Sequence, residues 1–127
     1  ILTHPHERED EMTDRIAIFA FNGEPMCFVH ALLNALNMRQ NGVDVALIIE
    51  GTATKTFCTF ASEDAEFHPL YQEVTQQGLV DCVCQACSHK TGVLDEVKRL
   101  GLPLCSELNG HPAMSRYVAE GYQIISM

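Results

Sequence analysis

A glycine followed by a short apolar run recurs along this chain and most limits what it can fold into. In each repeat, a polar or amphipathic segment ends in glycine, and an apolar run without clean alternation follows. The four repeats read RQNG-VDVALII, TQQG-LVDCVC, KRLG-LPLC and VAEG-YQIISM. A glycine in this place is typical of a helix end, because a left-handed conformation costs glycine nothing. Short runs rich in Val, Ile and Leu are typical of strands buried on both faces of a parallel sheet.

The segments between the apolar runs carry helical periodicity. Apolar residues recur there at spacings of three and four, which places them on one face of a helix. The four stripes lie within residues 29–36, 70–74, 93–100 and 114–118. With RIAIFAF (residues 15–21) as the first strand, the sequence predicts five strands alternating with four helices. Right-handed crossovers then give an α/β fold, an open parallel sheet with helices on both faces.

The length of 127 residues suits one domain with one core. Residues 1–14 are polar and acidic, and we expect a mobile leader there, followed by a single α/β domain over residues 15–127. No run of about 18 apolar residues predicts a membrane span. The first residues are not basic and then apolar, as a secretory signal would be, so we expect a cytoplasmic protein.

The formal net charge is −9, from 17 acidic and 8 basic residues. This balance disfavours nucleic acid and anionic membranes as partners, since both are negatively charged. Six cysteines in a cytoplasmic domain with a sufficient core argue against a disulfide framework. Reduced thiols, catalysis or metal binding are the uses that remain.

Three of the six cysteines fall in the segment DCVCQACSHKTG, residues 81–92. It follows the third predicted strand, and the loops beyond the carboxyl ends of parallel strands are where such sheets bind ligands. Cys87 lies at the start of a predicted short helix, whose unpaired N–H groups favour thiolate, and His89 and Lys90 act in the same direction. Cys84 is therefore the leading candidate for a reactive thiol, and Cys87 for an assisting or resolving thiol.

Two other uses of this cluster stay open. Cys84-x-x-Cys87 has the spacing of half a zinc site, which Cys82, Cys105, His89 or His111 could complete to bind zinc or iron. The same spacing beside a βαβ pattern is typical of a thioredoxin-like dithiol redox pair. The zinc interpretation is weakened because no second C-x-x-C or H-x-x-H pair completes the signature. The dithiol interpretation is weakened because the motif follows the third strand rather than the first.

The remaining candidates have simpler interpretations. We expect core packing for three cysteines: Cys27, Cys58 and Cys82. Cys105 could approach Cys84 if the third and fourth strands are neighbours. His111 has more functional weight than the other histidines because it lies in a loop at the active edge of the sheet, and a helix cap is at least an equal interpretation. Three glutamates that follow strands are expected to be solvated: Glu24, Glu50 and Glu107. EGTATKTF, in the loop expected at residues 50–57, does not match a phosphate-binding loop, and we expect no cofactor.

Three features together resemble the DsrE/DsrF-like family of intracellular sulfur relay and dissimilatory sulfur oxidation. They are the opening strand IAIFAF, the segment VCQAC at the end of the third strand, and the tail GHPAMSRYVAEGYQIISM. The resemblance covers residues 15–127. It implies a three-layer α/β/α sandwich with a five-stranded parallel sheet, layered as in flavodoxins, and a homotrimer or homohexamer.

The resemblance also implies a function for the cysteine cluster. In relay members of this family, a cysteine after the third strand accepts sulfane sulfur as a persulfide and passes it on. Cys84 occupies the matching position, which implies a sulfurtransferase-type carrier with protein partners that donate and accept sulfur. Cys82 and Cys87 depart from the family pattern of one cysteine, so reduction of the persulfide or metal binding stays open.

Overall fold

The structure is a computed structural model that describes residues 14–127. Its strands are β1 (Arg15–Ala20), β2 (Asp44–Ile49), β3 (Val80–Cys84), β4 (Leu104–Cys105) and β5 (Gln123–Ser126). Its helices are α2 (Pro25–Gln40), α3 (Ala53–Phe60), α4 (His68–Gln76), α5 (Gln85–Lys90), α6 (Leu94–Arg99) and α7 (Met114–Ala119). The leader predicted for residues 1–14 lies outside the described residues, apart from Asp14.

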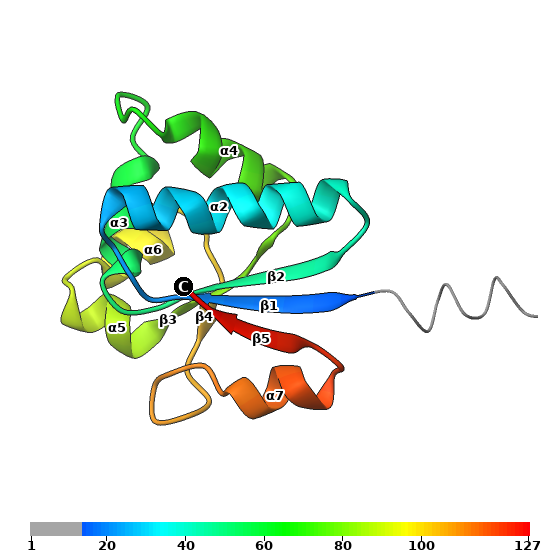
Figure 1. Cartoon of the computed structure of the whole chain (residues 1–127). Coiled ribbons are helices and arrows are strands. Elements are labelled where there is room, and N and C mark those ends of the chain that lie inside the picture. The colour runs from blue at the N-terminus through cyan, green and yellow to red at the C-terminus, as the bar shows by residue number, and fades with distance from the viewer. Residues whose placement is uncertain (1–13) are drawn as a thin grey trace, which may run out of the picture.

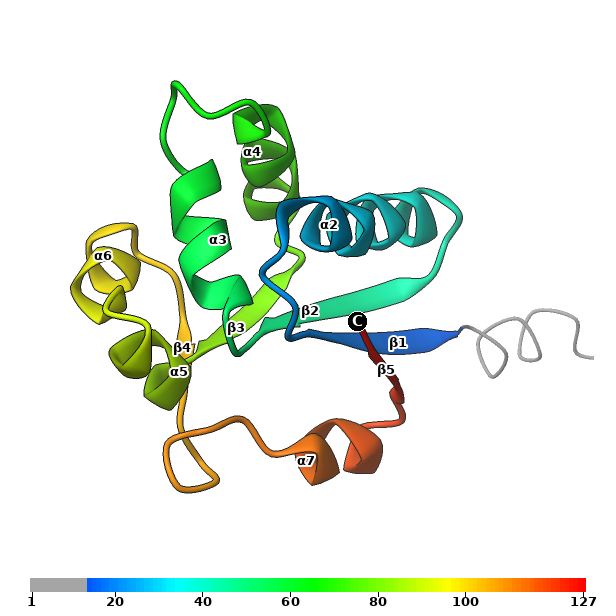
Figure 2. The same cartoon turned by 60° about the vertical axis from the view of Figure 1, so that its left-hand side comes forward.

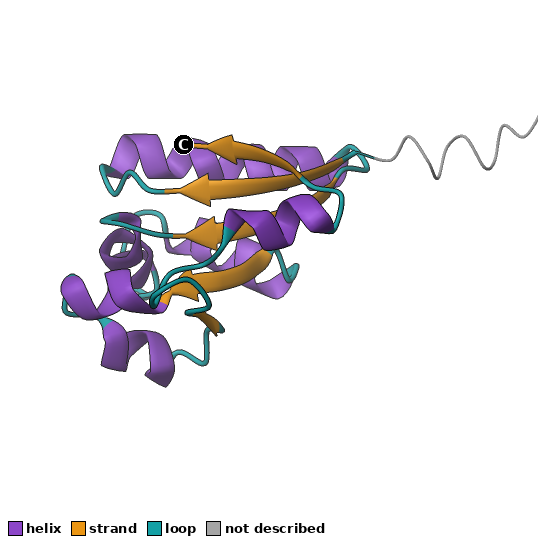
Figure 3. Ribbon diagram, turned by 90° about the horizontal axis from the view of Figure 1, so that it is seen from below, coloured by secondary structure: helices purple, strands orange, loops and turns teal. Residues whose placement is uncertain are grey.

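All strand pairs in the sheet are parallel, and the strand order is β4-β3-β2-β1-β5. The arrowheads in Figure 3 accordingly point in one direction, with the loops that follow the strands gathered at one edge. The predicted five-stranded parallel sheet is confirmed. The chain steps outward from β1 to β4 and then crosses to the other side of β1 for β5. Because crossovers are right-handed, this reversal places α7 on the face opposite the other helices.

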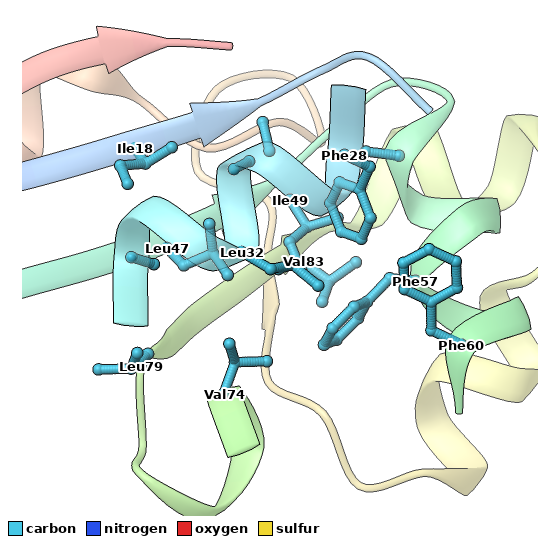
Figure 4. Close-up of a cluster of buried hydrophobic side chains, with 14 of the residues drawn as sticks. Ile18, Phe28, Leu32, Leu47, Ile49, Phe57, Phe60, Val74, Leu79 and Val83 are labelled. Atoms are coloured by element: carbon cyan, nitrogen blue, oxygen red, sulfur yellow. The ribbon is translucent and has the colours of Figure 1, made fainter. Parts of the chain in front are cut away.

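The two faces of the sheet carry separate cores, as a three-layer α/β/α sandwich requires. On one face, buried residues of β1, β2 and β3 pack under α2, α3, α4 and α6. Figure 4 shows part of this cluster, with Leu32 of α2 drawn among the sheet residues Ile18, Leu47 and Val83. The burial of each such side chain contributes about 1.5–3 kcal/mol. The second face is covered by α7, which Figures 1 and 2 show below the sheet, across from α2.

The number of helices differs from the prediction of four. Helix α3 occupies the segment expected to be a loop, and the short helix predicted at Cys87 is α5, which is separate from α6. Four residues of α3 are buried: Ala53, Thr54, Phe57 and Phe60. Their spacing defines one helical face, but the segment is rich in threonine, which has low intrinsic helix propensity. Packing of this face onto the core therefore overrides the local preference.

A disulfide bond joins Cys82 of β3 to Cys105 of β4. The expectation that the cysteines are reduced is therefore wrong for this pair, although Cys82 is buried as predicted. Strand β4 has only two residues, each in register with one residue of β3. So short an edge strand has few ladder hydrogen bonds, and the covalent link compensates for them. Among residues 14–127, no helix has the length and apolar character that crossing a bilayer requires.

Removal of this disulfide should destabilise the fold. The bond closes a loop with a sequence separation of 23 residues, for which chain entropy predicts a contribution of about 3 kcal/mol. We expect the double variant Cys82→Ala/Cys105→Ala to lose about this much free energy of unfolding in urea titrations. Reductant should lower the stability of the wild type by a similar amount and leave the double variant unchanged. Equal stability of the two proteins without reductant would contradict the assignment.

Candidate functional site

Four side chains with reactive or metal-ligating atoms meet at the carboxyl edge of the sheet. Glu50 follows β2, Cys84 ends β3, Cys87 lies in α5, and His111 lies in the loop between β4 and α7. One ligand atom from each lies within 4.8 Å of the others. Since β2, β3 and β4 are adjacent and parallel, their carboxyl ends bring together residues that are far apart in the sequence.

Cys84 is the last residue of β3 and also the N-cap of α5. Its side chain is completely buried. The Sγ atom accepts a hydrogen bond from the backbone N–H of Cys87 at 3.3 Å, and the thiol can donate to the carbonyl of Gly110 at 3.8 Å. The Nδ1 atom of His111 lies 3.2 Å from the same sulfur. The sulfur is therefore held between a backbone donor and an imidazole that can exchange a proton with it.

The position of His111 is fixed by a tight turn. Asn109 and Gly110 both have positive φ angles, 49° and 91°, as the two central residues of a type I′ turn require. Backbone hydrogen bonds of 2.7 and 2.8 Å join Leu108 and His111 across it. The carbonyl of Gly110 accepts from the N–H of Ala86 at 2.8 Å, which ties the turn to α5. His111 is thus held against the cysteines, and its expected role as a cap is wrong because Ala113 is the N-cap of α7.

Glu50 is buried, with 6% of its surface exposed, and the expectation of a solvated carboxylate is wrong. Its Oε1 atom lies 4.0 Å from Nδ1 of His111. Burial raises the pKa of this carboxyl to about 7, although its contact with the Cys84 thiol acts in the opposite direction. The side chain can therefore hold or release a proton near neutral pH. No sequence pattern around residue 50 indicates this burial, which depends on β2 lying in the middle of the sheet.

Burial also governs the thiol of Cys84. It raises the pKa of Cys84 to about 12, and the neighbouring Cys87 thiol and Glu50 carboxylate act in the same direction. The N–H of Cys87 lowers the pKa, but by less. The expectation that the helix N-terminus makes this cysteine a thiolate is therefore wrong for the free thiol. A group that accepts its proton is needed, and His111 is the neighbour placed to do so.

A pocket of about 470 Å³ opens beside the cluster. Glu50 and His111 lie in its wall, and the other lining residues are Phe21, Leu108, Pro112, Ala113, Met114 and Ser115. Three of the apolar side chains around it are exposed: Phe21, Leu108 and Met114. The pocket therefore reaches two members of the cluster, Glu50 and His111, past a largely apolar rim.

Of the candidates proposed from the sequence, Cys84, Cys87 and His111 are brought together. Cys105 pairs with Cys84 in the β3–β4 register, as two neighbouring strands would allow, but its sulfur is bonded to Cys82. Neither of these disulfide cysteines is available as a ligand, and His89 is outside the cluster. Cys58 is half-buried against the core as expected, whereas Cys27 is exposed at the start of α2.

Comparison with known proteins identifies the family. Residues 4–127 match the model of the DsrE/DsrF-like family. An uncharacterized protein of Methanocaldococcus jannaschii is 32% identical over 99 residues, which cover 78% of each chain. A second uncharacterized protein, from Archaeoglobus fulgidus, is 44% identical over 43 residues, which are 34% of this chain and 70% of that protein.

A solved structure shows the same fold. A conserved protein of unknown function from Bacteroides thetaiotaomicron matches with a TM-score of 0.68 over 90% of this chain and 95% of that one. Its sequence identity is 21%, so this likeness concerns the fold alone. The family match extends over almost the whole sequence. The chain belongs to the DsrE/DsrF-like family.

Proposed function

We propose that this protein is a cytoplasmic sulfur carrier in which Cys84 holds sulfane sulfur as a persulfide. Family membership suggests sulfur relay, and partners for it, at the level of the family. The observation that carries the finer proposal is the placement of the Cys84 sulfur. It lies at the end of β3, 3.2 Å from Nδ1 of His111 and 3.3 Å from the N–H of Cys87.

His111 is placed to accept the proton that the buried Cys84 thiol must lose before it can react. The nucleophile in persulfide chemistry is the thiolate, and the buried thiol of Cys84 does not ionise by itself near neutral pH. Transfer of its proton to the imidazole gives a thiolate beside an imidazolium, so that neither charge is left uncompensated. The N–H of Cys87 provides a second stabilising contact to the anion. The site therefore forms a nucleophile without a permanently exposed, oxidisable thiolate.

Sulfur transfer then requires no external oxidant or reductant. The Cys84 thiolate attacks the outer sulfur of a donor persulfide, R–S–SH, and the R–S⁻ thiolate leaves with the bonding electron pair. The products are Cys84–S–SH and the donor thiol once it gains a proton. An acceptor thiolate next attacks the same outer sulfur and regenerates the Cys84 thiolate. One S–S bond forms and one breaks in each step.

Cys87 is the resolving thiol in this scheme. Its sulfur lies 3.7 Å from Nδ1 of His111, the atom that Cys84 also contacts. Attack of the Cys87 thiolate on the inner sulfur of the persulfide expels hydrosulfide and leaves a Cys84–Cys87 disulfide. In this step the Cys87 thiolate is oxidised and the outer sulfur of the persulfide is reduced to hydrosulfide, so an external thiol must reduce the disulfide before the next round. When an acceptor is docked, transfer to it competes with this release.

The donor is a protein persulfide and the acceptor is a protein thiol, and both dock over the pocket. Its rim of Phe21, Leu108 and Met114 gives an apolar surface beside a polar wall of Glu50 and His111. A partner loop carrying a cysteine persulfide can bury apolar area on this rim while its sulfur reaches the site. A homotrimer or homohexamer remains part of the proposal.

Substitution of Cys84 tests the carrier directly. Intact mass spectrometry after incubation with a persulfide donor should show a gain of one sulfur atom in the wild type, mapped to Cys84. Cys84→Ser should abolish this gain, because a hydroxyl is not a nucleophile toward sulfane sulfur under these conditions. Cys27→Ser removes an exposed thiol outside the site and should load like the wild type. Undiminished loading of Cys84→Ser would contradict the proposal.

The pH dependence of loading tests the role of His111. Because burial raises the Cys84 pKa to about 12, the thiolate fraction without a proton acceptor should rise about tenfold per pH unit across neutral and mildly alkaline pH. We expect His111→Ala to load about 100-fold more slowly near pH 7 and to gain rate steeply with pH. The wild type should show a shallower profile, because the imidazole accepts the proton.

His89→Ala is the matched control, since this exposed histidine lies in α5 but outside the cluster. Its loading rate and profile should follow the wild type. Measurement of all three proteins with one donor cancels the titration of the donor itself. Parallel profiles for His111→Ala and the wild type would show that the imidazole does not take the proton.

A further inference from the structure

The four ligand atoms of the cluster all lie within 4.8 Å of one another, close to the spacing of a tetrahedral metal centre. The Nδ1 atom of His111 lies 3.2 Å from Sγ of Cys84, 3.7 Å from Sγ of Cys87 and 4.0 Å from Oε1 of Glu50. In a tetrahedral zinc site with the usual bond lengths, the ligand atoms stand roughly 3.3–3.8 Å apart. The Cys84 distance is slightly shorter than this range and the Glu50 distance is slightly longer, so ion binding would require these side chains to move.

From this geometry we propose that Glu50, Cys84, Cys87 and His111 bind one Zn²⁺ ion. Two thiolates and an imidazole are ligands that zinc prefers, and a single carboxylate oxygen is an accepted fourth ligand. Magnesium and calcium require sets of oxygen ligands that this cluster does not offer. The protein would thus supply all four positions, as in zinc sites that hold the metal rather than present it to a substrate.

Burial of the carboxylate supports the same site. Glu50 is 6% exposed, and among residues 14–127 His111 is the basic side chain that lies within 4.0 Å of its carboxylate. Buried charges are expensive unless a partner compensates for them, and metal coordination is one such compensation. A divalent cation in contact with Glu50 and the two sulfurs would balance charge that the surrounding protein does not.

The spacing of cysteines and histidines in the sequence does not predict this set of four ligands. A zinc site built on the C-x-x-C pair would draw equally on Cys82, Cys105 or His89. The disulfide withdraws the first two, and the strand order supplies Glu50 in their place. The pocket reaches Glu50 and His111 from solvent, so the ion has a path to the site. On binding, each thiol exchanges its proton for a bond to zinc, and two protons pass to solvent.

Zinc and sulfane sulfur would compete for the same atom, a consequence that rests on the sulfur carrier proposed above. A thiolate bonded to zinc shares its negative charge with the metal and is a weaker nucleophile, so a zinc-loaded chain should attack a persulfide much more slowly. The metal would then regulate the carrier, protecting the thiols from oxidation until it is withdrawn. Zinc binding itself does not depend on the sulfur chemistry.

The first experiment uses Co²⁺ and Zn²⁺ on the full chain, freed of metal with a chelator that is then removed. Co²⁺ should give tetrahedral ligand-field bands with a thiolate-to-cobalt band in the near ultraviolet, and Zn²⁺ should displace it at one ion per chain. Cys87→Ser and His111→Ala should each weaken zinc binding by at least about tenfold. Glu50→Gln, which conserves volume, should weaken it as well. Cys27→Ser should bind like the wild type.

Two outcomes would overturn the site. One is an octahedral cobalt spectrum without the thiolate band, and the other is zinc affinity unchanged in Cys87→Ser, His111→Ala and Glu50→Gln. Circular dichroism of each variant separates loss of a ligand from loss of the fold. Alkylation with iodoacetamide adds an internal comparison, since zinc should slow labelling of Cys87 and leave exposed Cys27 unaffected. Equal labelling of Cys87 with and without zinc would also count against the site.

The competition has its own measurement, which keeps the two proposals separable. Sulfur loading is compared in metal-free and zinc-loaded wild type, and we expect zinc to suppress it and chelation to restore it. Full loading of zinc-loaded protein would refute the competition. If metal-free protein bound zinc as above but gained no sulfur, the carrier would fail while the zinc site stood.

Discussion

The right-handed crossover from β4 to β5 is the constraint on which the site depends. The chain lays down β1 to β4 in one direction and must then return past the whole sheet to place β5 beside β1. Handedness sends α7 to the second face, so the loop before it has to turn over the carboxyl edge of the sheet. That loop carries His111 to the sulfur of Cys84. His111, in the loop between β4 and α7, thus joins a site whose two cysteines come from one short segment.

Packing on the second face holds this arrangement in place. Tyr117 of α7 is 1% exposed, and its hydroxyl donates to Asp81 of β3 and accepts from Arg116 at 2.8 Å. Arg116 also contacts Glu107 at 2.5 Å, in the loop that leads to His111. The pKa of Tyr117 is raised by burial and by Asp81, so the hydroxyl keeps the proton it donates. This satisfied polar network and the adjacent disulfide fasten α7, β3 and β4 to one another and limit the movement of the loop.

Features of the structure that depend on residues close together in the chain can be predicted from the sequence. Glycine-ended segments and apolar runs gave the strands, and the spacing of Cys84 and Cys87 gave the two thiols of the site. Glu50 and the Cys82–Cys105 bond were missed because both depend on which strands are neighbours, and periodicity carries no strand order. One local signal was overlooked. Asn109–Gly110 is the sequence typical of a type I′ turn, and it indicates that His111 follows a hairpin rather than starts a helix.

Burial sets the chemistry that this edge of the sheet can support. A sulfur with no exposure cannot stay an anion without a positive partner, and a carboxylate beside it has the same need. A proton compensates the Cys84 sulfur in the free thiol, an imidazolium would compensate the thiolate in the proposed sulfur carrier, and a zinc ion would compensate both groups in the proposed metal site. The three states use the same atoms, so each excludes the others. The site is therefore better described by what compensates its buried charge than by the cysteine motif alone.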